Sequence, residues 1–236
     1  MKKTILQLSA MGATALFAVT VANAQDTLGA GAPRLDVPKI FDAGGGDADN
    51  LRAGEPYVGA DLGPVFQQDL YIRNAGRTVS MDTGVRGDLF AGFNVADNLA
   101  LGMETGASSS RIRNSSVGVL GGNRAYLEQV PLLMDVILKA PLMGGVTPYI
   151  GGGIGGVVND ISVRQNGHWT DDADATFAYH AMAGVTFAFA RHFDVGLGYR
   201  FLGTPDHVFF PDDPTLYTPT GKIFSHSVLA TFVFSF

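Results

Sequence analysis

The hydrophobic and polar positions of residues 224–236 alternate with a period of two. One set of positions holds mainly phenylalanine, alanine and valine, and the other holds small, hydroxylated or aliphatic residues. This period is typical of a β-strand, because successive side chains of a strand point to opposite faces. The segment is also long enough to cross a bilayer, which takes a tilted strand about 9–11 residues. It predicts a membrane-crossing strand with one largely aromatic face.

The same alternation recurs along the chain and predicts eight strands. They are expected at residues 57–63, 85–95, 99–109, 126–139, 147–157, 176–190, 193–202 and 224–236. The connections alternate in length, with long ones at 64–84, 110–125, 158–175 and 203–222 and short ones at 96–98, 140–146 and 191–192. Outer-membrane barrels have short periplasmic turns and longer extracellular loops. The sequence therefore predicts an all-β fold: an eight-stranded antiparallel up-and-down transmembrane β-barrel with four long extracellular loops and short periplasmic turns.

A soluble barrel with an internal ligand cavity would show the same alternation, with its charged face outward. Three features favour the membrane barrel. Aromatic residues gather at the periplasmic ends of the apolar faces, as an interfacial girdle requires. The opposite faces are rich in glycine and poor in charge, which suits a narrow interior. The chain is 46% hydrophobic and only 16% charged, against about 25% charged for soluble domains.

The faces predicted to point inward carry most of the charged residues of the strands. These are Asp61, Arg86, Asp88, Glu104, Asp135, Lys139, Asp194 and Arg200, with His180 nearby. A barrel of eight strands has an interior that side chains fill, and buried charges must be paired. We predict a luminal charge network in which Arg86 and Arg200 bind some of the carboxylates. Its expected role is a structural plug, and the alternative is an ion path or a proton-responsive gate.

The first residues have the pattern of a secretory signal. Lys2 and Lys3 precede a mainly small or apolar stretch, and Ala22-Asn23-Ala24 supplies a cleavage site. We expect a signal peptide at 1–24, a flexible Gly-, Asp- and Pro-rich arm at 25–56, and the barrel at 57–236. The net charge of −6 argues against a nucleic-acid partner. The chain has no cysteine, so disulfides do not supply its stability.

Several short motifs resemble those of a known family. They are residues 147–156 (TPYIGGGIGG), 177–179 (FAY), 183–185 (AGV), 197–202 (LGYRFL), 226–229 (HSVL) and a terminal phenylalanine. From 57 to 236 the chain resembles the small eight-stranded outer-membrane proteins of Gram-negative bacteria, the opacity-protein and outer-membrane-protein-A-like barrels of the "porin family".

This resemblance implies a location in the cell outer membrane, with outer-membrane lipids and lipopolysaccharide around a monomeric barrel. It also implies assembly by the barrel-insertion machinery, which would read Phe232, Phe234 and Phe236 as a C-terminal signal. The expected function is structural or adhesive: envelope integrity, with loops that contact a host or cell-surface ligand. The loops mix aromatic and charged residues, namely Tyr71, Arg73, Arg111, Arg113, Trp169, Phe209, Phe210 and Tyr217. The alternative is a narrow porin-like channel for small solutes or ions.

Enzymatic and metal sites receive less support. Lipid A deacylases, which the chain resembles in size, use a His and a Ser two positions apart on one strand face. Here Ser225 and Ser227 fall on the face opposite His226, and Val228 takes the position two residues on. His-Asp groups at 168–172 and 206–213 lack a defined ligand spacing. We therefore expect no catalytic residue, metal or cofactor, and keep a lipid-modifying enzyme as the weakest alternative.

Overall fold

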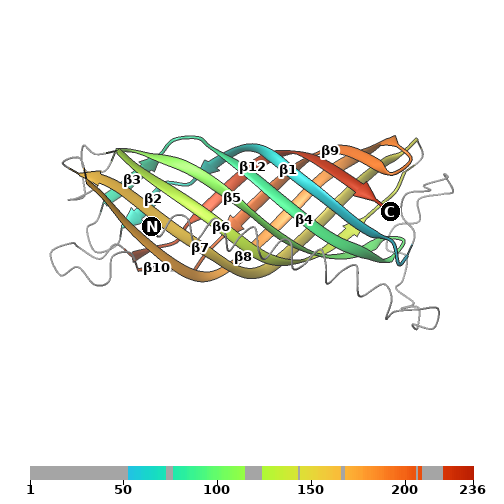
Figure 1. Cartoon of the computed structure of the whole chain (residues 1–236), viewed down its shortest axis with the longest axis horizontal. Coiled ribbons are helices and arrows are strands. Elements are labelled where there is room, and N and C mark those ends of the chain that lie inside the picture. Colours follow the sequence, from blue (N-terminus) through green and yellow to red (C-terminus); the bar gives the residue numbers. More distant parts are fainter. Residues whose placement is uncertain are drawn as a thin grey trace.

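The computed structural model describes residues 53–72, 77–114, 124–142, 144–165, 168–205, 207–208 and 220–236. Its main feature is a long barrel of eight tilted strands (Figure 1). They are β1 (Pro56–Gln67), β4 (Gly84–Ala96), β5 (Leu99–Asn114), β6 (Arg124–Lys139), β7 (Val146–Gln165), β8 (His168–Ala190), β9 (Phe193–Gly203) and β12 (Phe224–Ser235). Among the described residues, no helix is long and apolar enough to cross a membrane.

The eight strands form a closed antiparallel ring. Neighbouring strands of the ring are hydrogen-bonded in the order β5-β4-β1-β12-β9-β8-β7-β6, and β6 pairs back onto β5. The first and last of these strands lie side by side, with Tyr57 opposite Ser235. Closure leaves no free edge, which is the condition for a sheet to exist in lipid. The predicted fold class is confirmed.

The two ends of the barrel differ. At one end, which we call the turn end, the strands are joined by short turns at Asp97-Asn98, Gly144-Gly145 and Arg191-His192. Gly144 and Gly145 have φ values of 81° and 73°, a conformation that favours glycine in this tight turn. The opposite end, the loop end, carries the short strands β2 (Leu70–Ile72), β3 (Arg77–Met81), β10 (His207–Val208) and β11 (Thr220–Gly221).

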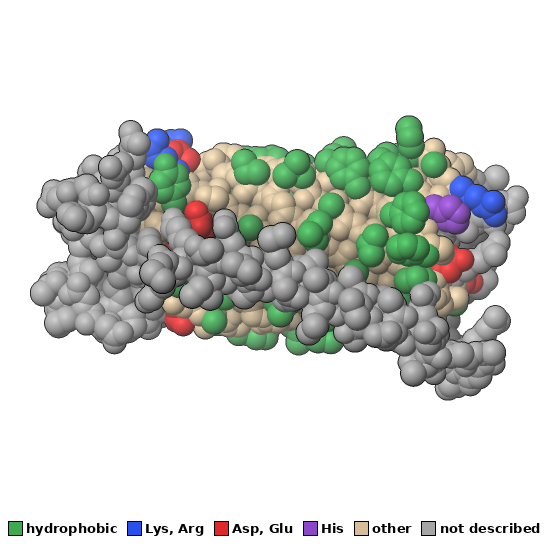
Figure 2. Space-filling model, in the orientation of Figure 1, with side chains coloured by type: hydrophobic (Ala, Val, Ile, Leu, Met, Phe, Trp, Pro, Cys, Tyr) green, Lys and Arg blue, Asp and Glu red, His purple; other side chains and the backbone are tan. Residues whose placement is uncertain are grey.

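The outer wall of the barrel is apolar. Large hydrophobic side chains stand exposed around it, including Val85 (62%), Ile154 (61%) and Phe189 (76%). Figure 2 shows such side chains over the middle of the visible wall and charged side chains at the two ends. In water this surface would be an aggregation site, whereas in a bilayer it contacts the acyl chains. The predicted outward faces are confirmed.

Aromatic residues form one group on the wall at the turn end and another, including Phe201 and Phe224, toward the loop end. Phe193 stacks on Phe232, with 6.4 Å between ring centroids, and meets Phe189 edge-on at 6.2 Å. Phe234 and Phe236 form a second edge-on pair at 5.2 Å. Rings at this level are typical of the girdle where a barrel wall passes from lipid to water.

The strands extend further at the loop end than the sequence predicts. The expected long connections at 110–125 and 158–175 are wrong in extent: β5 continues to Asn114, and β7 and β8 remain paired as far as Gln165 and His168. There the strands carry polar residues on both faces, such as Asn159 and Asp160, so the two-residue alternation fades although the backbone pairing continues. Likewise, β1 runs beyond its expected end at residue 63 to Gln67.

Candidate functional site in the barrel interior

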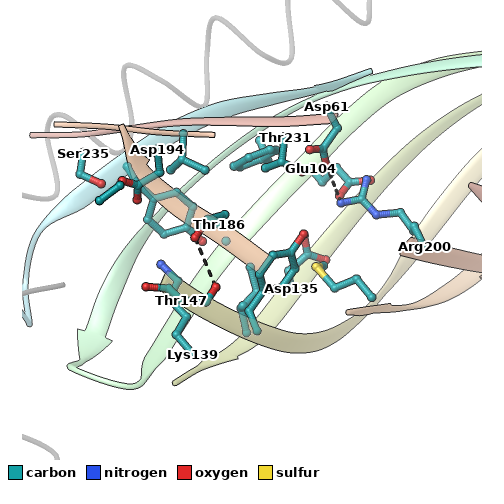
Figure 3. A pocket seen from close by; sticks show the side chains of 18 of the residues that line it. Asp61, Glu104, Asp135, Lys139, Thr147, Thr186, Asp194, Arg200, Thr231 and Ser235 are labelled. Atoms are coloured by element: carbon teal, nitrogen blue, oxygen red, sulfur yellow. Dashed lines mark hydrogen bonds and ion pairs between the residues drawn. The ribbon is translucent and has the colours of Figure 1, made fainter. Parts of the chain in front are cut away.

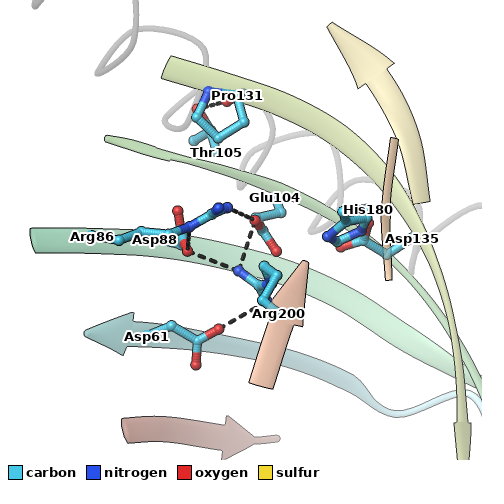
Figure 4. A network of polar contacts seen from close by, with 9 residues as sticks. All are labelled: Asp61, Arg86, Asp88, Glu104, Thr105, Pro131, Asp135, His180 and Arg200. Carbon is cyan, nitrogen blue, oxygen red and sulfur yellow. Dashed lines mark hydrogen bonds and ion pairs between the residues drawn. The ribbon is translucent and has the colours of Figure 1, made fainter. Parts of the chain in front are cut away.

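Two arginines and three carboxylates form a network across the middle of the interior (Figure 4). Arg86 Nε lies 2.6 Å from Asp88 Oδ2, and Arg86 Nη2 lies 3.0 Å from Glu104 Oε1. Arg200 Nη1 lies 2.8 Å from both Asp88 Oδ2 and Glu104 Oε1. Arg200 Nη2 binds Asp61 Oδ2 at 3.0 Å. Residues from β1, β4, β5 and β9 are thus tied together through four strands of the ring.

This network is almost completely removed from solvent. Each of the five residues is at most 5% exposed. Buried charges are tolerated only when they are paired, and removing one partner of such a pair typically costs about 3–5 kcal/mol. Two guanidinium groups face three carboxyl groups in this network. Glu104 Oε2 is buried and has no hydrogen-bond partner among the described residues.

A separate buried pair lies beside the network. His180 Nε2 is 2.6 Å from Asp135 Oδ1, and both residues are 5% exposed. Gly153 lies on β7, the strand between them. Its lack of a side chain makes room for the pair, because a Cβ atom there would lie 2.5 Å from His180 Nε2. Asp135 is therefore held by histidine rather than by either arginine.

Further toward the loop end the interior becomes apolar and then polar again. Leu133, Val157, Ala178 and Leu202 form a cluster in which no residue is more than 1% exposed. Beyond this apolar layer, Gln67 Nε2 donates to Gln129 Oε1 at 2.7 Å, and Gln129 Nε2 donates to Asn159 Oδ1 at 2.8 Å. Ion pairs, apolar side chains and amides thus fill the interior in successive layers.

The turn-end half of the interior contains a cavity of about 140 Å³ (Figure 3). It is lined by Leu142 and Gly145 at the turn end, by apolar and aromatic side chains, and by Asp61, Glu104 and Arg200 of the network. Because roughly 10–15 Å³ of such space accommodates one water molecule, the cavity has room for several. Its lining residues extend from the turn end to the ion pairs.

Lys139 and Asp194 line the cavity close to the turn end. Lys139 Nζ donates to Asn94 Oδ1 at 2.9 Å and lies 4.6 Å from the centre of the Tyr57 ring. A cation over an aromatic face is attracted by the ring quadrupole. These contacts hold the ammonium group against the wall rather than in the centre of the cavity.

Inward-facing glycines make room for two tyrosines, of which Tyr57 is buried and Tyr149 is half-buried. A Cβ atom at Gly184 or Gly198 would lie 2.6 Å or 2.5 Å from the Tyr149 hydroxyl oxygen. Gly92 and Gly102 stand in the same relation to Tyr57, at 2.6 Å and 2.8 Å. The large rings therefore lie across glycine backbone, and this packing shapes the cavity walls.

The structure divides the predicted luminal residues into three groups. Five of them form the arginine network, Asp135 pairs with His180, and Lys139 and Asp194 lie near the turn end. Sequence reasoning missed the bulky residues that line the cavity: Tyr57, Phe90, Tyr149 and Met182. Their signal was available, because each is a large residue at an inward position whose neighbouring strands carry glycine.

The candidate catalytic histidine lies elsewhere. His226 faces outward, where Nδ1 is 2.6 Å from the Tyr199 hydroxyl and Nε2 is 2.8 Å from Gln68 Nε2. Ser225 and Ser227 point inward and are fully buried. Within the described part of the chain, no three His, Cys, Asp or Glu residues could together hold a metal ion. The His-Asp groups at 168–172 and 206–213, and the loop residues Arg73, Phe209, Phe210 and Tyr217, lie largely or wholly outside the described residues or side chains.

A closed antiparallel barrel with a lipid-compatible wall and a charged interior defines the outer-membrane β-barrel class. The chain belongs to the family of the outer membrane protein beta-barrel domain, which matches residues 11–232. It is therefore an outer-membrane protein, and the turn end faces the periplasm. No curated protein gives a significant match.

Solved structures share this fold at low sequence identity. The outer membrane protein OprG from Pseudomonas aeruginosa superposes with a TM-score of 0.53 at 14% identity, over 80% of this chain and 99% of OprG. Neisserial surface protein A gives a TM-score of 0.50 at 17% identity, over 77% and 97% of the two chains. AlkL, solved in DMPC lipid bilayers, gives 0.50 at 15%, over 78% and 92%. These likenesses concern the fold alone.

Proposed function

We propose that this protein is a closed barrel with a structural and surface-interaction role: it contributes to envelope integrity and presents its loop end to a host or cell-surface ligand. The observation that carries the proposal is the filled interior. The arginine network and the apolar layer lie one behind the other, and their central residues are at most 5% exposed. An interior packed in this way stabilises a barrel and blocks solute passage.

The remaining parts of the chain fit the same proposal. Residues 1–24 are removed after Ala24, and residues 25–56 form an arm before the barrel. The mature protein is a monomer among outer-membrane lipids and lipopolysaccharide. Phe232, Phe234 and Phe236, which stand 43%, 43% and 61% exposed on the outer wall, form the signal that the barrel-assembly machinery reads. Intact mass of the membrane-extracted protein tests the cleavage site.

A narrow channel is the second candidate, and the cavity favours it. Because the cavity extends to the ion pairs, the network, the apolar layer and the amides are what the described residues place between it and the loop end. Movement of Arg86 or Arg200 would then open a path. A lipid-modifying enzyme is a weaker third candidate, and unchanged lipid composition in a His226→Ala strain would exclude a role for that histidine.

Planar-bilayer conductance of the refolded mature protein separates the first two candidates. The proposal expects a folded but silent barrel, with folding shown by the heat-dependent shift of barrels on unheated gels. Discrete openings that change in Arg86→Ala, but not in Arg113→Ala, would establish the channel instead. Arg113 is the matched control because it pairs with Asp82 at the loop end and is 67% exposed.

A further inference from the structure

We propose that the outer wall at the loop end binds one phosphorylated glycolipid of the outer leaflet at a fixed site. The residues that form this site are Gln68, Tyr199, Lys222 and His226. Such a site rests on the proposed function and deepens it, because it names where a molecule of the surrounding lipopolysaccharide is held. Gln68 follows β1, Tyr199 lies on β9 and His226 on β12, and these three strands are neighbours in the ring (Figure 1).

Three polar side chains of the site form a hydrogen-bonded cluster on the outer wall. His226 Nδ1 lies 2.6 Å from the Tyr199 hydroxyl oxygen, and His226 Nε2 lies 2.8 Å from Gln68 Nε2. The amide nitrogen of Gln68 is a donor, so in a neutral ring Nδ1 carries the hydrogen and donates to the Tyr199 oxygen. The Tyr199 O–H and the second N–H of Gln68 can then donate to a phosphate or sugar oxygen.

Aromatic rings surround the imidazole of His226. Its centre lies 5.4 Å from that of the Phe201 ring and 6.0 Å from that of the Tyr199 ring, and Phe201 in turn lies 5.7 Å from Phe224. The wall on the turn-end side of this cluster is apolar, with exposed side chains at Leu62, Leu197 and Val228. Amphipathic rings are typical of the membrane interface. The cluster therefore offers rings and donors to a lipid headgroup and apolar wall to its acyl chains.

The position of His226 along β12 places it at the outer edge of the lipid-facing band. Phe236 and His226 are ten residues apart. At about 3.3 Å per residue and a tilt of about 40°, ten residues rise about 25 Å, which is roughly the height of the apolar band of an outer-membrane barrel. Because Phe236 belongs to the aromatic group at the turn end, His226 lies at the level of the outer-leaflet headgroups.

Lys222 supplies a cation above this level. The alternation of buried and outward side chains continues past the start of β12, since Ile223 is 3% exposed and Lys222 is exposed. Lys222 therefore lies on the same face as His226, four residues nearer the loop end. Its long side chain can bring the ammonium group to a lipid phosphate and form a charge-assisted hydrogen bond there. Asp69, an exposed acid just beyond β1, accepts a hydrogen bond from Ser80 Oγ at 3.2 Å.

Native mass spectrometry of the refolded mature protein with added diphosphoryl lipid A, the lipid anchor of lipopolysaccharide, tests the site. Phosphatidylglycerol is the anionic probe without sugars. We expect one saturable lipid A adduct and at least tenfold weaker binding of phosphatidylglycerol. The double variant Lys222→Ala/His226→Ala should lower the lipid A affinity at least tenfold. Arg111→Ala is the matched control and should leave the affinity unchanged, because Arg111 is an exposed base near the loop end of β5, three strands away from β12.

Tyr199→Phe keeps the test independent of folding, because it removes one hydroxyl group and retains the ring. It should lower the lipid A affinity at least threefold, and the gel shift verifies that each variant folds. Adducts that do not saturate, equal affinity for the two lipids, unchanged binding in the folded double variant, or an equal loss in Arg111→Ala would each overturn the proposal. The conductance experiment is separate: a silent barrel without this site would keep the closed-barrel role and lose only the fixed lipid.

Discussion

Arg200→Ala is the substitution for which the structure gives the clearest energetic expectation. Arg200 contacts three buried carboxylates, at 2.8, 2.8 and 3.0 Å. Its removal leaves Arg86 as the only arginine among Asp61, Asp88 and Glu104. Deleting one partner of a buried ion pair typically costs about 3–5 kcal/mol. We expect a loss of about 4 kcal/mol in the free energy of unfolding.

Urea unfolding of the refolded barrel, followed by circular dichroism and by the gel shift, measures this loss. With a slope of about 2 kcal/mol per molar, the midpoint should fall by roughly 2 M urea. Arg113→Ala removes an arginine from an exposed pair and should change stability by less than about 1 kcal/mol. Equal midpoints for the wild type and Arg200→Ala would refute the idea that the network stabilises the barrel.

Three further predictions follow from the packing. Gly184→Ala should destabilise the barrel by about 1–3 kcal/mol in the same urea titration, because the added Cβ would lie 2.6 Å from the Tyr149 hydroxyl. Gly156→Ala is the control: its Cβ would meet no atom nearer than 3.7 Å, so it should leave stability unchanged. Leu133→Ala should cost about 2–5 kcal/mol by emptying the apolar layer, and a midpoint within error of wild type would contradict that layer. Phe236→Ala should slow insertion by the assembly machinery in membranes while spontaneous refolding in detergent keeps its rate; equal slowing of both would assign this ring a folding role instead.

The sequence was most informative where one face of a strand meets lipid. Over β4, for example, Val85 and Leu89 alternate with Arg86 and Asp88, and the structure places the first pair outside and the second inside. At the loop end both faces meet water or polar side chains, so nothing in the residue order marks the continuation of β7 and β8. Strand ends there depend on backbone pairing rather than on side-chain polarity.

The interior was predictable in its composition but not in its partners. Alternation alone places Arg200 and Asp135 inside. Which carboxylate pairs with which basic side chain depends on the stagger between strands. Because of this stagger, Arg200 reaches across β12 to Asp61 and Asp88, whereas Asp135 pairs with His180. The cavity arises in the same way, because it is defined by where Tyr57 and Tyr149 lie over glycines of other strands.

The central claim is that the barrel interior is closed between the cavity and the loop end, and cysteine labelling tests it most directly. The chain has no cysteine, so each introduced thiol reports one position. Val233→Cys in the cavity should react with a small charged thiol reagent supplied at the turn end. Ala178→Cys in the apolar layer, where Ala178 is 0% exposed, should stay unmodified from both sides until the barrel is unfolded. Labelling of Ala178→Cys in the folded barrel would contradict the closed interior.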